Sequence, residues 1–142
     1  MSAEDVALVR RIAPGPGVDI ASTLADDELI AQWLADLQPS FHNSVRTTMR
    51  FPGLAPVTYT GGLTGVLDAW RDWLRGWASF RVEIEDVLED QDRIVLVFRG
   101  RGLPRPDAPE ITLRRAAVWT VTDGRVASVD FNVPCHEALP SA

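Results

Sequence analysis

The sequence contains few of the residues that form disulfides and metal sites. It has one cysteine, Cys135, and two histidines, His42 and His136, among 142 residues. A single cysteine excludes an internal disulfide, and two histidines far from any cysteine cluster lack the ligand spacing of a zinc site. We therefore expect no bound metal ion and no organic cofactor.

Long apolar runs and clustered positive charge are also missing. No stretch approaches the ~18 apolar residues that span a bilayer, and the opening segment MSAEDVALVRR has no apolar core before a cleavage site. The formal charge is −6 and the arginines are scattered, which is not the pattern of a nucleic-acid binder. We expect a soluble, cytoplasmic protein that binds neither nucleic acid nor a membrane surface.

The composition is typical of one globular domain. Hydrophobic residues make up 46% of the chain and charged residues 24%, and the length is enough to bury a core. We therefore predict a single domain over residues 1–142.

The strongest pattern lies between Thr64 and Trp77, which hold three of the five tryptophans. Apolar side chains recur there at helical spacing, while aspartates and arginines fall on the opposite face. The apolar positions are Val66, Leu67, Trp70, Trp73, Leu74 and Trp77. This segment is predicted to form an amphipathic helix, begun by Thr64, that packs on a large apolar surface.

The remaining segments alternate between helix and strand periods. Two helices precede the tryptophan helix; Pro14 to Gly17 ends the first, and the second runs from Asp26 and Asp27 to Leu37 before Pro39. Residues 54–62 are predicted to be a loop. The predicted strands span residues 41–51, 79–89, 92–102, 110–121 and 125–133. Their order indicates an α+β fold with a curved, mostly antiparallel sheet covered on one side by helices.

Several short motifs in this order resemble those of the nuclear transport factor 2-like superfamily, in its SnoaL-like polyketide-cyclase branch. They are GLTG at 62–65, AWRDW at 69–73, VEIEDVLED at 82–90, DRIV at 92–95, AVWTV at 117–121, DGRV at 123–126 and EAL at 137–139. The resemblance covers nearly the whole chain. It implies a cone-shaped sheet wrapped around a pocket that the helices close, and members commonly pair as homodimers through their sheets.

The resemblance also implies several activities, which differ in the acidic residues they need. Isomerases of this fold use a carboxylate base on or near the first strand, but the chain has no Asp or Glu between Asp36 and Asp68. Cyclases carry an inward acid on the last strand, at the position that Phe131 holds here. The acid stands one residue earlier, at Asp130, and strand alternation predicts that it points away from the face that Phe131 occupies. An epoxide-hydrolase set of two aspartates bridged by an arginine is not apparent.

Three further side chains are candidates for polar contacts with a ligand. Asn43 and Thr47 share the predicted inward face of the first strand, where they either orient a ligand or bond to neighbouring backbone. Tyr59 lies in the predicted loop and either donates its hydroxyl to a ligand carbonyl or packs at the surface. With Asp130, Tyr59 is our candidate catalytic residue.

One arginine is a candidate anion site. Arg115 alternates with the apolar positions of its strand, so on an inward face its guanidinium would need a ligand anion or a nearby acid such as Glu83 or Glu85. If the register differs by one residue, Arg114 takes this position and Arg115 is exposed.

The aromatic residues favour an apolar ligand. Most of them form the core, but some must line an open cone, and Trp70, Trp73, Trp119 and Phe131 are our candidates for contacting a ligand. The leading hypothesis is a dimeric pocket protein that binds a small, mainly apolar molecule, polyketide- or terpenoid-like. The alternatives are a cofactor-independent acid/base enzyme (cyclase, isomerase, dehydratase or epoxide hydrolase) and an interaction module whose tryptophans fill the cone. An open cavity of ~300 Å³ or more favours the first two.

Overall fold

The computed structural model describes residues 3–139 as an α+β structure. The helices are α1 (Ala3–Ile12), α2 (Ile20–Leu24), α3 (Asp27–Leu37), α4 (Leu63–Leu74) and α5 (Cys135–Ala138), with a 3-10 turn at Gln38–Ser40. The strands are β1 (Phe41–Met49), β2 (Val57–Tyr59), β3 (Ser79–Asp90), β4 (Arg93–Leu103), β5 (Ile111–Thr122) and β6 (Arg125–Val133). The predicted fold class is confirmed.

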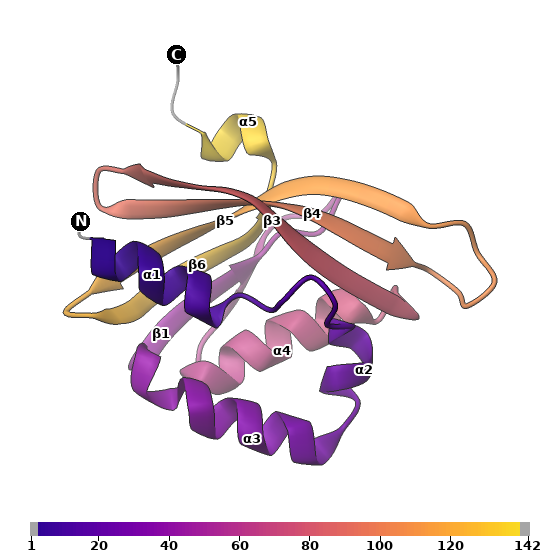
Figure 1. Ribbon diagram of the computed structural model, residues 1–142, viewed down its shortest axis with the longest axis horizontal. Coiled ribbons are helices and arrows are strands. Elements are labelled where there is room, and N and C mark those ends of the chain that lie inside the picture. Colours follow the sequence, from indigo (N-terminus) through magenta and orange to yellow (C-terminus); the bar gives the residue numbers. More distant parts are fainter. Residues whose placement is uncertain (1–2, 140–142) are drawn as a thin grey trace.

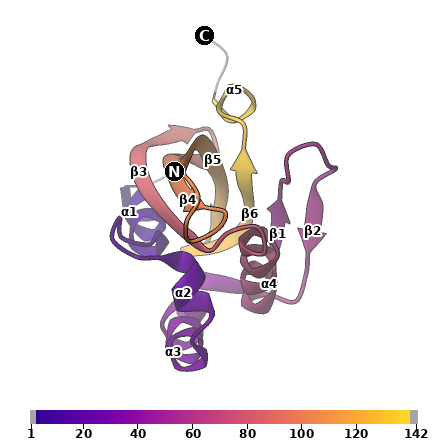
Figure 2. The same ribbon diagram turned by 90° about the vertical axis from the view of Figure 1, so that its right-hand side faces the viewer.

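The strands form one curved, unclosed sheet. Their order is β2-β1-β6-β5-β4-β3, and all neighbours are antiparallel except β1 and β6, which run parallel. Helices α1 to α4 lie on one side of the sheet, and the short α5 lies on the other (Figure 1). Seen from the end, β3, β4 and β5 curl over α1 and α2, which gives the half-open cone (Figure 2).

The helix ends follow the local sequence in two cases and depart from it in a third. α1 ends at Ile12, just before Pro14, and the side chain of Asp26 accepts hydrogen bonds from the first turn of α3. The prediction that Thr64 begins the tryptophan helix was wrong. The helix begins at Leu63 after Gly62, whose φ of 69° and whose close approach to the Asn43 carbonyl leave no room for a side chain.

Two short elements, in addition to the 3-10 turn, were not predicted. α2 covers five residues in the segment between the first two predicted helices, and β2 covers three residues in the segment predicted as loop. β2 pairs with the end of β1, where Thr47 is opposite Tyr59. Neither element has enough residues to show a period in the sequence, so neither could be predicted from it. Elements this short are stable only when they pack against other parts of the fold.

The main core lies between the concave face of the sheet and the helices. It includes Phe41, Val45, Met49, Phe80 and Ile94, all at most 2% exposed. A second, smaller cluster lies on the opposite face of the sheet under α5, and it was not predicted. Its buried members are Val95, Val97, Ala116, Val133 and Ala138. Within residues 3–139, no helix is both long and apolar enough to cross a membrane.

Candidate functional site

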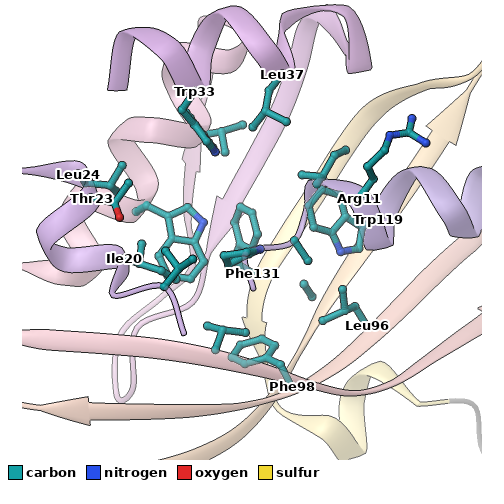
Figure 3. A pocket seen from close by; sticks show the side chains of 18 of the residues that line it. Arg11, Ile20, Thr23, Leu24, Trp33, Leu37, Leu96, Phe98, Trp119 and Phe131 are labelled. Atoms are coloured by element: carbon teal, nitrogen blue, oxygen red, sulfur yellow. The ribbon is translucent and has the colours of Figure 1, made fainter. Parts of the chain in front are cut away.

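A cavity of about 390 Å³ lies between the helices and the concave face of the sheet. Figure 3 shows its walls, with Trp33 and Leu37 coming from α3 and Leu96 and Phe98 from the sheet on the opposite side. This volume exceeds the ~300 Å³ expected of an open cone. Arg11, Thr23 and Asp36 are the polar residues among those that line it, so its surface is mainly apolar.

The helical wall comes from segments far apart in the sequence. The end of α1 and the following turn contribute residues 11–14, α2 contributes Ile20, Thr23 and Leu24, and α4 contributes Val66 and Trp70. The proline at position 14 ends α1 and turns the chain beside the cavity. The exposed side chains of Arg11 and Asp36 place one positive and one negative charge on this wall.

The sheet wall is aromatic at its centre. The rings of Phe131 and Trp119 meet edge to face, with centroids 5.7 Å apart and planes at 86°. Trp70, on α4, also packs edge to face against Phe131, with ring centroids 5.3 Å apart and planes at 68°. These three rings border the cavity and hold one another in fixed orientations, as expected of edge-to-face aromatic pairs.

The tryptophans of the α4 segment have different environments. Trp70 borders the cavity, whereas Trp73 and Trp77 are not among the lining residues and pack with Phe80, at centroid distances of 5.8 and 5.3 Å. Glycines in β4 make room for these rings, because a Cβ at Gly102 would lie 2.5 Å from Cζ3 of Trp77. Aromatic side chains therefore fill the cone around Phe80, and Trp70 is the tryptophan of this segment that borders the cavity.

The indole nitrogen of Trp119 is a buried donor that has no partner in the described part of the chain. Trp119 is 4% exposed, and no residue within 3–139 accepts a hydrogen bond from its Nε1. An unpaired buried donor costs about 1–3 kcal/mol, and such groups in folded proteins call for a specific explanation. Here the unpaired group belongs to a ring in the cavity wall.

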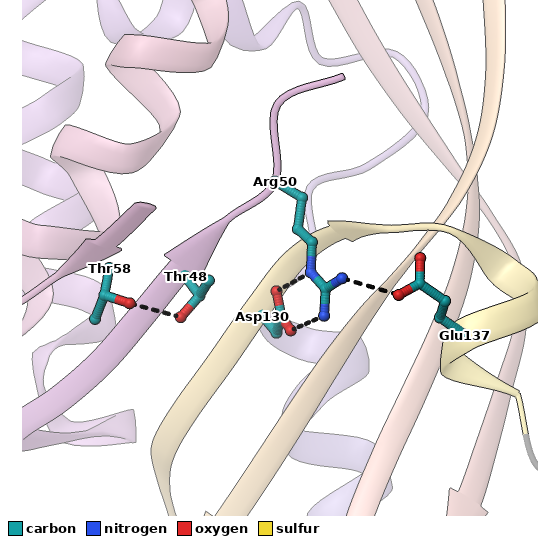
Figure 4. Close-up of polar contacts among 5 residues, drawn as sticks. All are labelled: Thr48, Arg50, Thr58, Asp130 and Glu137. Carbon is teal, nitrogen blue, oxygen red and sulfur yellow. Dashed lines mark hydrogen bonds and ion pairs between the residues drawn. The ribbon is translucent and has the colours of Figure 1, made fainter. Parts of the chain in front are cut away.

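Asp130 does not line the cavity. It lies on the other face of β6 from Phe131, where its carboxylate binds the guanidinium of Arg50 with Nη2–Oδ2 and Nε–Oδ1 distances of 3.1 and 3.4 Å (Figure 4). Arg50 also binds Glu137 of α5 at 3.1 Å, and these bonds, led by that to Asp130, raise the pKa of Arg50. This acid is therefore used to hold the end of β1 against β6 and α5.

Tyr59 is also engaged outside the cavity. Its hydroxyl donates a hydrogen bond of 2.6 Å to Oδ2 of Asp72 on α4. Burial, followed by this hydrogen bond, raises the pKa of Tyr59 to about 12. The bond ties the edge strand β2 to α4, and a phenol with so high a pKa is a poor proton donor near neutral pH.

The two polar candidates on β1 have different surroundings. Asn43 is exposed, and it lies in the part of β1 where the register with β6 is irregular, between Phe41 and Arg46. Thr47 is fully buried, and its Oγ1 has no hydrogen-bond partner in the described part of the chain. Neither residue is among those that line the cavity.

Glu85, one of the two acids expected near Arg115, binds Arg114 instead. Glu85, the extra residue of a bulge in β3, accepts a 2.7 Å hydrogen bond from Arg114 and pairs with Arg99 at 3.0 Å. The bond from Arg114 is the main cause of the lowered pKa of Glu85. Arg115 is half-buried opposite Phe98 and does not line the cavity.

The candidate ligand contacts that line the cavity are therefore Trp70, Trp119 and Phe131. Arg11, Trp33 and Asp36 also line the cavity, and the sequence patterns did not single out these three residues as ligand contacts. No local motif marks these residues, because the wall forms only when α1 and α3 pack over the sheet. Within residues 3–139, no group of three or more His, Cys, Asp or Glu side chains could hold a metal ion.

This curved sheet, with helices closing a cavity on its concave face, defines the nuclear transport factor 2-like class of folds. Residues 27–129 match the model of the SnoaL-like domain, which is more than half of the chain. The chain belongs to the SnoaL-like family. The sequence matches no curated protein.

Solved structures show the same fold at low sequence identity. A nuclear transport factor 2-like protein of unknown function from Burkholderia pseudomallei K96243 is 20% identical, with 92% of this chain and 89% of that chain covered and a TM-score of 0.62. TerC, co-crystallised with polyporic acid, is 16% identical, with coverage of 90% and 89% and a TM-score of 0.62. A protein assigned as a SnoaL-like polyketide cyclase from Jannaschia sp. CCS1 is 15% identical, with coverage of 92% and 87% and a TM-score of 0.61.

Proposed function

We propose that this protein binds a small, mainly apolar molecule, polyketide- or terpenoid-like, in the cavity between the helices and the sheet. The observation that carries the proposal is the cavity itself, whose 390 Å³ lies within the ~300–1,000 Å³ typical of small-molecule sites. Its wall combines aromatic rings with few polar groups, which is the usual composition of sites for lipophilic ligands. The fold it shares with TerC, which has been crystallised with polyporic acid, adds support from a distant relative.

Binding is favoured over catalysis by the position of the acidic groups. Asp130 and Tyr59 have polar partners outside the cavity, so neither is placed to move a proton to or from a molecule inside it. Asp36 is the carboxylate among the lining residues of the described chain. A cofactor-independent acid/base enzyme is the second candidate function, and it would have to act through Asp36 at the wall.

A variant that fills the cavity tests the binding proposal. Ala117 is 3% exposed and lies on the β5 wall, so Ala117→Phe places a ring inside the cavity. A thermal-shift screen of lipophilic ketones, quinones and hydrocarbons, with polyporic acid included, should yield compounds that stabilise the wild type. Ligand at 100 times Kd adds ~2.7 kcal/mol, which raises Tm by roughly 8 °C in a domain of this size.

The control is Thr112→Phe, which adds the same ring at an exposed position of the same strand. Compounds that bind in the cavity lose their thermal shift in Ala117→Phe and keep it in Thr112→Phe. If every stabilising compound acts equally on both variants, ligands bind elsewhere and the proposal is wrong.

The enzyme alternative is tested with the compounds that bind. Incubation with the protein followed by mass spectrometry detects conversion, and conversion that is lost in Asp36→Asn but kept in Asp27→Asn would establish Asp36 as a catalytic residue. Asp27 is exposed at the start of the same helix, so it controls for the change in charge.

Homodimerisation through the sheet and a cytoplasmic location also stay predictions, and sedimentation velocity measures whether the protein is a dimer.

A further inference from the structure

A second, smaller cavity of about 220 Å³ lies at the β3 edge of the sheet. The start of β3 and the end of β4 form most of its wall, which Pro16 and Glu110 complete. The charged residues in this wall are Arg81, Glu83, Arg99, Arg101 and Glu110. Charged side chains therefore dominate this cavity, whereas the main cavity is mainly apolar.

Arginines on this part of the sheet face one another across neighbouring strands. The register places Arg81 of β3 opposite Arg101 of β4, and Arg99 of β4 opposite Arg114 of β5. Both pairs lie on the face away from the helices, because the alternating residue Phe80 is buried in the main core. Like charges directly opposite each other are destabilising, and a negative charge between them relieves the repulsion.

One of the two arginine pairs has its counter-charge within the protein. Oε1 of Glu85 accepts a 2.7 Å hydrogen bond from Nε of Arg114, and Oε2 of Glu85 lies 3.0 Å from Nη2 of Arg99. A single carboxylate thus bridges both guanidinium groups of this pair.

The other pair has no bridging carboxylate among residues 3–139. Arg81 donates from Nη1 to the hydroxyl of Ser79 at 2.9 Å and has no acidic partner in this part of the chain. Arg101 lies 3.9 Å from the carboxylate of Glu83, which is too far for a hydrogen bond. Both arginines of this pair line the smaller cavity.

We propose that the smaller cavity binds a divalent oxyanion of the phosphate type, which accepts hydrogen bonds from Arg81 and Arg101. The anion takes the bridging position that Glu85 has in the neighbouring pair. Guanidinium groups match the spacing of phosphate oxygens and bind them through two parallel hydrogen bonds. The wall also holds the acids Glu83 and Glu110, but its three arginines outnumber them. This inference is independent of the ligand proposed for the main cavity.

Titration with inorganic phosphate at constant ionic strength, followed in ¹H–¹⁵N spectra, tests the proposal. We expect saturable shifts of the amide signals of residues 79–83 and 99–103, with a Kd on the order of 1 mM for a few exposed charged hydrogen bonds. Arg81→Gln and Arg101→Gln should each raise this Kd about tenfold. Arg125→Gln removes the same charge at an exposed position outside the cavity, so it should leave the Kd within about twofold of the wild type.

The acids of the wall give a prediction of the opposite sign. Glu83→Gln removes a negative charge beside the anion, so phosphate should bind about fivefold more tightly. Glu89→Gln removes the same charge at an exposed position near the other end of β3, and it should leave the Kd within about twofold. Acetate carries a single charge and should bind at least about tenfold more weakly than phosphate.

Three results would overturn this inference. They are the lack of saturable shifts at these residues up to roughly 50 mM phosphate, an equal loss of affinity in Arg81→Gln and Arg125→Gln, and equal binding of acetate and phosphate. The wild-type titration needs no variant. Each of these results leaves the proposal for the main cavity in place, because that proposal depends on the lipophilic screen and on Ala117→Phe.

Discussion

Replacing Asp72 with asparagine should lower the pKa of Tyr59. The Tyr59 hydroxyl donates to the Asp72 carboxylate at 2.6 Å, and ionising the phenol would place two negative charges side by side. The neutral amide removes that repulsion and weakens the hydrogen bond. Because Tyr59 is the only tyrosine in the sequence, its titration is observed without overlap.

The size of the change follows from the causes of the shift. The pKa of Tyr59 is about 12 against an ordinary value of 10.0, and burial is the largest cause, ahead of the hydrogen bond and charge of Asp72. Asp72→Asn leaves the burial in place, so the pKa should move part of the way, to a value between 10 and 12. Asp68→Asn on the same helix should have little effect, since Asp68 is the smallest of the causes.

The shift also fixes the sign of a change in stability with pH. A phenol whose folded-state pKa exceeds its unfolded value stays neutral in the folded protein after the unfolded chain has ionised. The stabilisation from Tyr59 is therefore complete below pH 10 and is lost as the pH rises from 10 towards 12. In Asp72→Asn this loss should end at a lower pH.

Absorbance at 295 nm measures the phenolate, and far-UV circular dichroism in the same samples shows whether the protein is still folded. A wild-type midpoint near pH 10 in folded protein would refute the hydrogen bond to Asp72. Equal midpoints for wild type and Asp72→Asn would also refute it.

Two further substitutions test the packing around Trp77 and the position of Asp130 on the face of β6 away from the cavity. Gly102→Ala places a Cβ 2.5 Å from the ring of Trp77, so we expect the free energy of unfolding to fall by about 1–3 kcal/mol, as for other overpacked cores. Urea unfolding measures it, and Gly76→Ala, where a Cβ meets nothing within 4 Å, should cost far less. Asp130→Asn weakens the pair with Arg50, whose two side chains are about 30% exposed, so we expect a loss below ~1 kcal/mol and unchanged affinity for cavity ligands. A large change in ligand affinity in Asp130→Asn would contradict the outward position of this acid.

The amphipathic pattern of α4 and the motifs along the chain were enough to predict the fold. The spacing of Trp70 and Trp73 indicates one buried helical face whatever that face packs against, because helical periodicity is a local property. The same holds for strands, in which alternation predicts opposite faces for Asp130 and Phe131. Local signals failed at Asn43, which is exposed in the part of β1 where the register with β6 is irregular.

The sequence by itself determined the fold class, the family and the presence of an aromatic interior, since periodicity, turn residues and motif order are all written along the chain. Only the tertiary structure decided which rings border the cavity. Trp73 and Trp77 pack around Phe80 because Gly100 and Gly102 of a distant strand leave space for the rings packed there, while Trp70 meets Phe131 at the cavity. It also decided that Arg50 pairs with Asp130 and that the indole N–H of Trp119 has no acceptor among the described residues, because both depend on distances between strands that no local pattern encodes.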